Sequence, residues 1–305
     1  MLSIKEFLEK SEGRAKIHKN FEGTADKEFC QKAIVCIPDM HLLEKKRNDD
    51  FFDNNQKHVE RFLDFLDFLV ENKNDLQVVQ LGDMFDLWQA RGNTNLIYAV
   101  PEYANILGLM DEELKPIYVI GNHDIDIFEW YRDQGRTFDR KYRYFLSDNE
   151  EKKIRVIFEH GFQADFYNNQ DSWSGAIGRE ITEVVGWMEN LIPDIDLILG
   201  ESWDKFKRVF TIYNSGLTPR KNPSFNEHEY YKYYIELMKK YNDGDTDDLE
   251  EPTELVLAVV AHTHKARLIS RPNNYLMDCG SWVNGGHEFG IVAGNQFAVC
   301  EWNIT

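Results

Sequence analysis

The most restrictive feature of this sequence is a pattern that occurs five times, in which a short hydrophobic run is followed within two residues by Asp, Asn or His. Apolar runs of about four to eight residues bounded by turn-forming residues are typical of buried β-strands. The runs cover residues 33–38, 76–81, 117–120, 154–159 and 255–261. Each run therefore predicts a strand whose end carries polar side chains.

An amphipathic helix is predicted over residues 55–72, where apolar residues recur at i, i+3 and i+4. These positions are Val59, Phe62, Leu63, Leu66, Leu69 and Val70. A second helix is expected over residues 95–110, with Pro101 at its start or at a kink. Strands that alternate with helices favour right-handed crossovers and a largely parallel sheet. The ends of parallel strands meet at one edge of a sheet, so we expect the polar clusters to converge there.

Shorter elements complete the expected α/β main domain. Ile4, Phe7 and Leu8 have the spacing of a short helix. Three further strands are expected over residues 275–279, 289–293 and 296–302, and the last two are joined by a turn at residues 293–295.

Residues 165–251 differ from the rest of the chain because three helical stripes follow one another without a strand signal. The stripes contain Ile181, Val184, Val185, Met188, Leu191 and Ile192, then Trp203, Phe206, Phe210 and Tyr213, then Tyr230, Tyr234, Leu237 and Tyr241. We therefore expect a core formed by residues 1–164 and 252–305, with residues 165–251 inserted as a helical cap.

The net charge of −18 restricts the possible partners of this chain of 305 residues. Such an acidic protein is a poor candidate for sequence-independent binding to nucleic acid or to an anionic membrane surface. An anionic substrate could bind if metal cations supplied local positive charge. The four cysteines form no Cys-x-x-Cys pair, and the charged N-terminal segment does not resemble a signal peptide. The longest apolar run is too short to cross a bilayer, and we expect a cytoplasmic protein.

Seven side chains at the strand ends are candidate metal ligands. They are Asp39, His41, Asp83, Asn122, His160, His262 and His264. Their oxygen and nitrogen atoms suit Mn, with Fe or Zn as alternatives, and suit Mg less well. Alternation along a strand would let Asp39 act with His41, and His262 with His264. Seven ligands are too many for one ion, so we expect two divalent ions that share a bridging carboxylate, with Asp83 as the candidate.

Two neighbouring cations can hold a bridging hydroxide that attacks phosphorus in line with the leaving oxygen. His123 is the candidate general acid, because it is adjacent to the candidate ligand Asn122. An acid–base histidine needs a carboxylate that orients its ring, and Asp86 is the first choice, with Asp124 the second. Any one of these residues could instead serve a turn or a helix cap. Five such clusters at five strand ends favour a shared site.

Together these residues resemble the five signature blocks of the calcineurin-like metallophosphoesterase superfamily, in the same order. The blocks are Asp39-x-His41, Gly82-Asp83-x-x-Asp86, Gly121-Asn122-His123-Asp124, His160-Gly161 and His262-x-His264. The resemblance covers residues 33–283 apart from the insert, and implies a four-layer sandwich of two mixed β-sheets flanked by helices. It implies one metal held by Asp39, His41, Asp83 and His264, and another held by Asp83, Asn122, His160 and His262. His123 would be the catalytic histidine, oriented by Asp86. Ala261, where the family usually has glycine, and Glu159 depart from the pattern.

Residues 82–88 and the helical insert are also similar to UDP-2,3-diacylglucosamine hydrolases, which cleave a pyrophosphate. That family usually has arginine at the position of His123, and favours basic surfaces. We therefore expect a phosphodiester or pyrophosphate substrate that is small and phosphorylated, of nucleotide or UDP-sugar-lipid type. Two alternatives remain open: a catalytically silent scaffold that binds a protein partner, and a DNA nuclease of the same superfamily.

Overall fold

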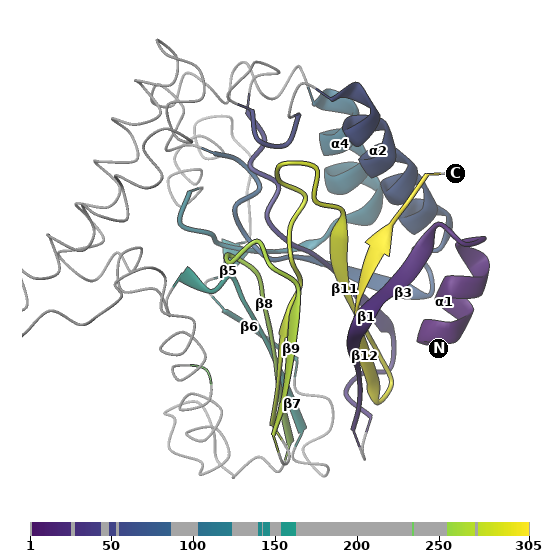
Figure 1. Ribbon diagram of the computed structural model, residues 1–305, viewed down its shortest axis with the longest axis vertical. Helices are drawn as coiled ribbons and strands as arrows, with labels where there is room; N and C mark the ends of the chain where they lie inside the picture. Colours follow the sequence, from purple (N-terminus) through teal and green to yellow (C-terminus); the bar gives the residue numbers. More distant parts are fainter. Residues whose placement is uncertain are drawn as a thin grey trace, which may run out of the picture.

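The computed structural model describes residues 2–25, 28–43, 49–52, 55–86, 103–123, 140–141, 143–146, 154–162, 234, 255–271 and 274–304. Within these residues the chain forms two β-sheets that face each other, with helices against the outer side of the larger sheet (Figure 1). Apart from Tyr234, the predicted insert at residues 165–251 lies outside the described residues, so the domain division stays a prediction.

The larger sheet has seven strands in the order β1-β12-β11-β2-β3-β4-β5. Their bounds are Ala15–Thr24 (β1), Gln296–Trp302 (β12), Glu288–Ala293 (β11), Ala33–Ile37 (β2), Leu76–Gln80 (β3), Ile117–Val119 (β4) and Arg140–Lys141 (β5). The strands from β2 to β5 are parallel, and β11, β12 and β1 are antiparallel to their neighbours. The predicted parallel arrangement of the first three hydrophobic runs is therefore confirmed.

The smaller sheet has five strands in the order β6-β7-β8-β10-β9. Their bounds are Arg143–Leu146 (β6), Ile154–Glu159 (β7), Leu255–Val260 (β8), Asn274–Asp278 (β10) and Arg267–Arg271 (β9). The three central strands are parallel, and an antiparallel strand lies at each edge. Both sheets are thus mixed, as expected.

Two of the helices on the larger sheet begin at side chains that accept hydrogen bonds from their free N–H groups. Ser3 and Glu6 form a reciprocal capping box at the start of α1 (Ile4–Lys10), and Asn55 caps α2 (Gln56–Glu71). The short helix α4 (Ala104–Gly108) continues as a π-helical segment, η1 (Leu109–Leu114). Among the described residues, no helix has the length and apolar character needed to cross a membrane.

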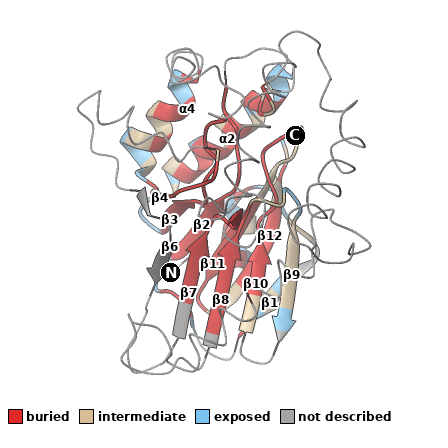
Figure 2. Ribbon diagram, turned by 90° about the vertical axis from the view of Figure 1, so that its left-hand side faces the viewer, coloured by how far each residue is buried: buried red, intermediate tan, exposed pale blue. Residues whose placement is uncertain are grey.

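Side-chain alternation along β2 divides the interior into two cores. Ala33, Val35 and Ile37 pack among the residues beneath the helices. Ile34 and Cys36 pack between the two sheets. The central strands are consequently largely buried on both faces (Figure 2), which is why β2 and β8 appear in the sequence as unbroken apolar runs.

The edge strands β1, β5, β6 and β9 were not predicted. β1 contains Lys16, His18 and Lys19, and β9 begins and ends with arginine. Edge strands carry charges of this kind because one side has no strand partner, so the apolar signal is weak.

The described part of the predicted second helix runs to Leu114, past the expected end at residue 110. The expected hairpin joins β11 to β12, with Gly294 at a φ of 60°.

Asp49 is a buried carboxyl in the loop between β2 and α2. Its Oδ1 accepts hydrogen bonds from the backbone N–H groups of Phe51 and Phe52, at 3.1 Å and 3.0 Å, and the Tyr103 hydroxyl donates to Oδ2 at 2.5 Å. Burial raises the pKa of Asp49 to about 7; the charge of Asp50 adds to the rise, and the hydrogen bonds oppose it. The folded protein therefore keeps a proton here that the unfolded chain releases near pH 4.

We expect Asp49 to lower the free energy of unfolding as the pH rises from about 4 to about 7, by about 4 kcal/mol at most. In this pH range the folded state binds more protons than the unfolded state, so raising the pH destabilises the folded state. Asp49→Asn removes the titration and can keep the hydrogen bonds, so its stability relative to wild type should increase with pH. Urea unfolding of both proteins across this range measures the difference. A pH-independent difference would contradict the prediction.

Candidate metal centre

The predicted ligands lie just past the C-terminal ends of five parallel strands, three in the larger sheet and two in the smaller. Asp39 and His41 follow β2, Asp83 follows β3, Asn122 follows β4, His160 follows β7, and His262 and His264 follow β8. The structure brings all seven side chains, together with Asp86 and His123, to one edge of the molecule.

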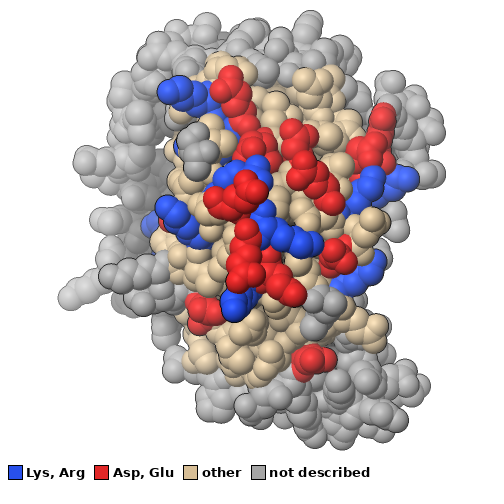
Figure 3. All heavy atoms as spheres, turned by 90° about the vertical axis from the view of Figure 1, so that its right-hand side faces the viewer, with Lys and Arg blue, Asp and Glu red and all other residues tan. Residues whose placement is uncertain are grey.

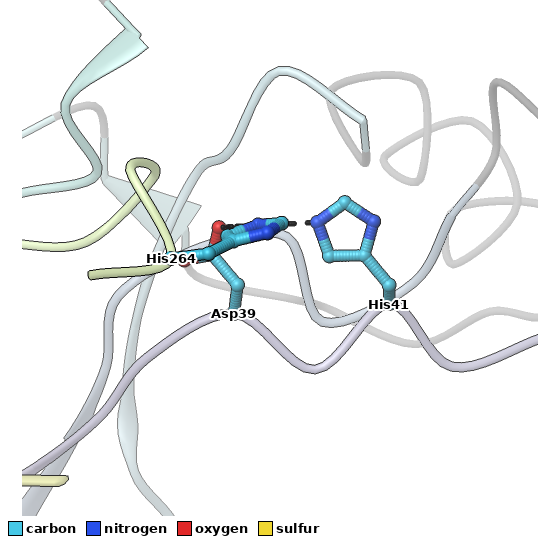
Figure 4. Close-up of side chains that lie close together, drawn as sticks. All are labelled: Asp39, His41 and His264. Atoms are coloured by element: carbon cyan, nitrogen blue, oxygen red, sulfur yellow. Dashed lines mark ion pairs between the residues drawn. The ribbon is translucent and has the colours of Figure 1, made fainter. Parts of the chain in front are cut away.

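Asp39, His41 and His264 form a first group of ligand atoms. His264 Nε2 lies 2.9 Å from Asp39 Oδ2, and His41 Nε2 lies 3.8 Å from the same oxygen (Figure 4). One ligand atom of each residue lies within 4.8 Å of the others. Asp39 and His41 are buried, whereas the side chain of His264 is 37% exposed, so the group is open to solvent on one side.

Asp83, His160 and His262 form a second group with the same spacing. His160 Nε2 lies 3.1 Å from Asp83 Oδ2 and also 3.1 Å from Asn122 Oδ1. Asp83, Asn122 and His160 are almost fully buried. Carboxylate, amide and imidazole atoms thus surround one position between the strand ends.

Asp83 lies between the two groups. Its Oδ2 is 3.1 Å from His160 Nε2 in the second group and 3.4 Å from His41 Nε2 in the first. A carboxylate in this place can bridge two cations, which is the role that the sequence assigned to it.

The candidate ligand atoms of the first group are arranged as they would be around a cation. Asp39 Oδ2 and His41 Nε2 are buried, yet neither makes a hydrogen bond of regular geometry within the described part of the chain. Their separation of 3.8 Å and shared proximity to His264 are expected of atoms that converge on an ion. Their chemistry, oxygen with nitrogen and without sulfur, suits Mn, Fe or Zn.

Three buried aspartates give the site its negative charge. Burial opposes ionisation of Asp39 and Asp83, but the nearby charge of His160 and the close approach of other histidines hold the pKa of each carboxyl well below its usual range. Burial alone would lower the pKa of His41, whereas the adjacent carboxylates of Asp39, Asp83 and Asp86 raise it well above its ordinary value. Bound divalent cations would supply positive charge beside these buried carboxylates.

Contacts behind the ligands fix which nitrogen each histidine presents. His160 Nδ1 lies 2.8 Å from the carbonyl oxygen of Leu81, which accepts a hydrogen bond from this nitrogen. The other ring nitrogen, Nε2, therefore faces Asp83. His41 Nδ1 lies 3.4 Å from Asp86 Oδ2, so its Nε2 also faces the site. Metal-binding histidines commonly have such partners on the opposite ring nitrogen.

His123 lies beside the two groups and contacts Asp86. Its Nδ1 is 2.8 Å from Asp86 Oδ1, and its backbone N–H donates to Asp83 Oδ1 at 2.8 Å. Burial opposes ionisation of Asp86, but the charge of His123 and bonds from His123 and His41 keep the pKa of this carboxyl below its usual range. The geometry therefore favours Asp86 as the orienting carboxylate, while Asp124 lies outside the described residues.

The paired candidate ligands were predicted to lie on strands, but the structure places them in loops. β2 ends at Ile37 and β8 at Val260, so the paired ligands lie in loops and strand alternation does not aim them. His41, His262 and His264 have positive φ values of 51°, 73° and 54°. This left-handed conformation is uncommon for residues with a side chain. It sends His262 and His264 to different groups, which a shared strand face would not do.

Two glycines allow the loops to approach each other. A Cβ at Gly121 would lie 1.9 Å from Asp83 Oδ1, and one at Gly82, whose φ is +99°, would lie 2.6 Å from the backbone nitrogen of Gly121. Both positions therefore require glycine, which explains why a glycine precedes both Asp83 and Asn122.

Both departures from the family pattern are buried in the structure. Ala261 is buried, has no positive φ, and donates its N–H to the His160 carbonyl oxygen at 2.8 Å. Glu159 is buried at the end of β7 and lies opposite Arg143 in the pairing with β6.

The sequence did not reveal Asp278, a buried carboxyl at the end of β10 that contacts Thr263, the residue between His262 and His264. Its signal was the same as for the ligands, an aspartate at a strand end.

The family model for calcineurin-like phosphoesterases matches residues 32–266, more than half of the chain. No curated protein sequence gives a significant match. Among solved structures, the E. coli phosphoesterase Yfce is 14% identical with a TM-score of 0.37, over 86% of this chain and 88% of that chain.

Two other solved structures are similar at the same level. Vacuolar Protein Sorting 29 from Cryptosporidium parvum is 12% identical with a TM-score of 0.37, over 87% of this chain and 85% of that chain. An archaeal phosphodiesterase is 11% identical with a TM-score of 0.34, over 87% of this chain and 99% of that chain. Similarity this low adds nothing to the family match, which by its extent shows that this chain belongs to the calcineurin-like phosphoesterase family.

Proposed function

We propose that this protein is a dinuclear metal-dependent phosphoester hydrolase that acts on a phosphodiester or a pyrophosphate. The observation that carries the proposal is the pair of adjacent ligand groups that meet at Asp83, with the His123–Asp86 pair beside them. Asp39, His41, Asp83 and His264 would hold one ion, and Asp83, Asn122, His160 and His262 the other. Bound cations would supply a hydroxide nucleophile and positive charge for the phosphoryl oxygens.

His123 would donate a proton to the leaving oxygen. With Nδ1 directed at Asp86, the ring presents Nε2 as the position from which a proton can leave. The contact of Asp86 Oδ1 with Nδ1 at 2.8 Å would keep the ring in one orientation. Poor leaving groups gain most from a proton donor, which favours the ester oxygens of a diester or pyrophosphate over an activated phenol.

The substrate that we propose is small and nucleotide-like. His123 stands where the UDP-2,3-diacylglucosamine hydrolases usually have arginine, and the net charge of −18 disfavours an anionic lipid surface. On the face that carries α1, acidic and basic side chains of the described residues are interspersed (Figure 3). The net charge of −18 disfavours the electrostatic binding of nucleic acid that a nuclease needs. All four cysteines are buried and free, which fits a reducing compartment such as the cytoplasm.

Hydrolysis of bis-(p-nitrophenyl) phosphate by chelator-treated protein tests this proposal. We expect no turnover until Mn²⁺ is added, and we expect a panel of nucleotides, sugar nucleotides and diesters to contain better substrates. p-Nitrophenyl phosphate in the same buffer serves as the monoester control. Absence of turnover with Mn, Fe and Zn, together with less than one bound ion per chain, would favour the scaffold alternative. Salt-sensitive binding of single-stranded DNA would favour a nuclease.

A further inference from the structure

Thr263 lies between His262 and His264, and its side chain leaves the loop to contact the smaller sheet. The Thr263 hydroxyl donates to Asp278 Oδ2 at 2.5 Å, and its oxygen accepts the backbone N–H of Lys265 at 3.2 Å. The side chain thus connects the end of the loop, just past His264, to a carboxyl on another strand.

Asp278 is fixed by its own surroundings. It is fully buried at the last position of β10, where it pairs with Val260, the last residue of β8. Its Oδ1 accepts the backbone N–H of Gly280 at 3.3 Å, and the next residue, Cys279, donates its N–H to the Val260 carbonyl oxygen at 2.9 Å. Strand pairing and hydrogen bonds therefore hold this carboxyl in place beside the end of β8.

The loop that Thr263 holds has an unfavourable backbone. Thr263 N–H donates to the Ala261 carbonyl oxygen at 2.9 Å across His262, whose φ is 73°. This is a γ-turn with positive φ at its central residue, a rare and strained conformation. His264 is left-handed as well, at 54°. Such residues stay in place only when surrounding contacts hold them.

The orientation of this loop affects both ligand groups. His264 Nε2 lies 2.9 Å from Asp39 Oδ2 in the first group, whereas His262 belongs to the second group with Asp83 and His160. The His262 N–H also donates to Asp39 Oδ1 at 3.1 Å. A rotation of the loop about Thr263 would displace one ligand of each ion.

We propose that Asp278 is a positioning residue, which acts through the Thr263 hydroxyl to hold His262 and His264 in the conformation that binds both metal ions. The inference rests on the proposed metal centre and adds to it two residues that are not ligands. Contacts of this kind behind metal ligands typically contribute about 10- to 100-fold to metal affinity.

The test compares Mn²⁺ binding by Thr263→Val and Thr263→Ser in the full chain, after metal has been removed with a chelator. Valine keeps the shape of threonine without its hydroxyl, and serine keeps the hydroxyl. We expect calorimetry to show affinity about 10-fold weaker or more for Thr263→Val at both sites, and affinity close to wild type for Thr263→Ser. Electron paramagnetic resonance of the loaded proteins should show a weaker coupled Mn²⁺ signal for the valine variant only.

Two further variants separate positioning from general stability. Burial raises the pKa of Asp278 well above its ordinary value. Asp278→Asn is therefore a neutral replacement, and its one carbonyl oxygen can take either the position that accepts the Thr263 hydroxyl or the one that accepts the Gly280 N–H, but not both. We expect it to bind Mn²⁺ better than Asp278→Ala, which can accept neither. Thr24→Val, at an exposed end of β1, should bind Mn²⁺ as wild type does. The metal-free proteins should unfold at similar temperatures.

The outcomes separate this inference from the proposed function. Wild-type affinity in Thr263→Val, or equal losses in the valine and serine variants, would overturn the positioning role while leaving the metal centre intact. A fall in the melting temperature of metal-free Thr263→Val that accounts for its weaker binding would also overturn it. Failure of the wild-type protein to bind Mn²⁺ at all would overturn the proposed function itself.

Discussion

Asp83→Asn is expected to lose bound metal and hydrolytic activity together. Oδ2 of this buried carboxylate lies 3.1 Å from His160 Nε2 and 3.4 Å from His41 Nε2, so it faces both ligand groups. The asparagine amide is neutral and cannot offer two carboxylate oxygens to two cations. Because even residues that only support ligands contribute about 10- to 100-fold to metal affinity, we expect a loss of about 100-fold or more for this shared ligand.

The measurement is the metal content of wild type and variant after equilibration with the same free Mn²⁺, followed by the diester assay. Asp75→Asn is a matched control, because Asp75 is partly exposed and pairs with Lys10 on the surface. It should keep wild-type metal content and rate. An Asp83→Asn protein that retained both ions would show that the two groups are not joined through this carboxylate.

His123→Ala has the second large expected effect, and it should separate metal binding from catalysis. His123 contacts Asp86, and its ring lies 4.5 Å from that of His41, but the proposed ligand sets do not include it. We expect metal content close to wild type and activity lower by about 10²- to 10⁴-fold, the usual contribution of a positioned acid. The loss should be greatest on diesters with poor leaving groups, and smaller on p-nitrophenyl esters.

Initial rates on a series of diesters with leaving groups of increasing pKa test this prediction. His18→Ala is the control, because His18 lies on the edge strand β1 and pairs with Glu301. If His123→Ala instead released the metals, His123 would be a ligand and its assignment as the acid would be wrong. An equal loss on every leaving group would also argue against proton donation.

The strands that the sequence predicted well are those buried on both faces. Residues such as Ile34 and Val35 on β2 pack on opposite sides of one sheet, so the run is apolar throughout and easy to identify. β1 and β9 lie at sheet edges with charged residues among the apolar ones. β1 pairs with β12, which is far away in the sequence, whereas β9 pairs with the adjacent β10 but has arginine at both ends, so neither strand has a strong local signal.

The side chains of the candidate site could be named from the sequence because their chemistry and their place near strand ends are both visible there, and their role as ligands stays a prediction. The loops that carry them were not, because nothing in the sequence shows that His41 or His262 has a positive φ. The carbonyl oxygen of Leu81, which fixes the ring of His160, is a backbone atom that every residue has. Asp278 reaches Thr263 through the register of two strands, which only the fold establishes.

The central claim is that loops from two sheets enclose a pair of divalent cations on which hydrolysis depends. Elemental analysis of an active preparation, before and after treatment with a chelator, tests it most directly. We predict two divalent ions per chain in active protein, loss of activity as they are removed, and recovery when Mn²⁺ is restored. Full activity in protein that contains no metal ion would contradict the account.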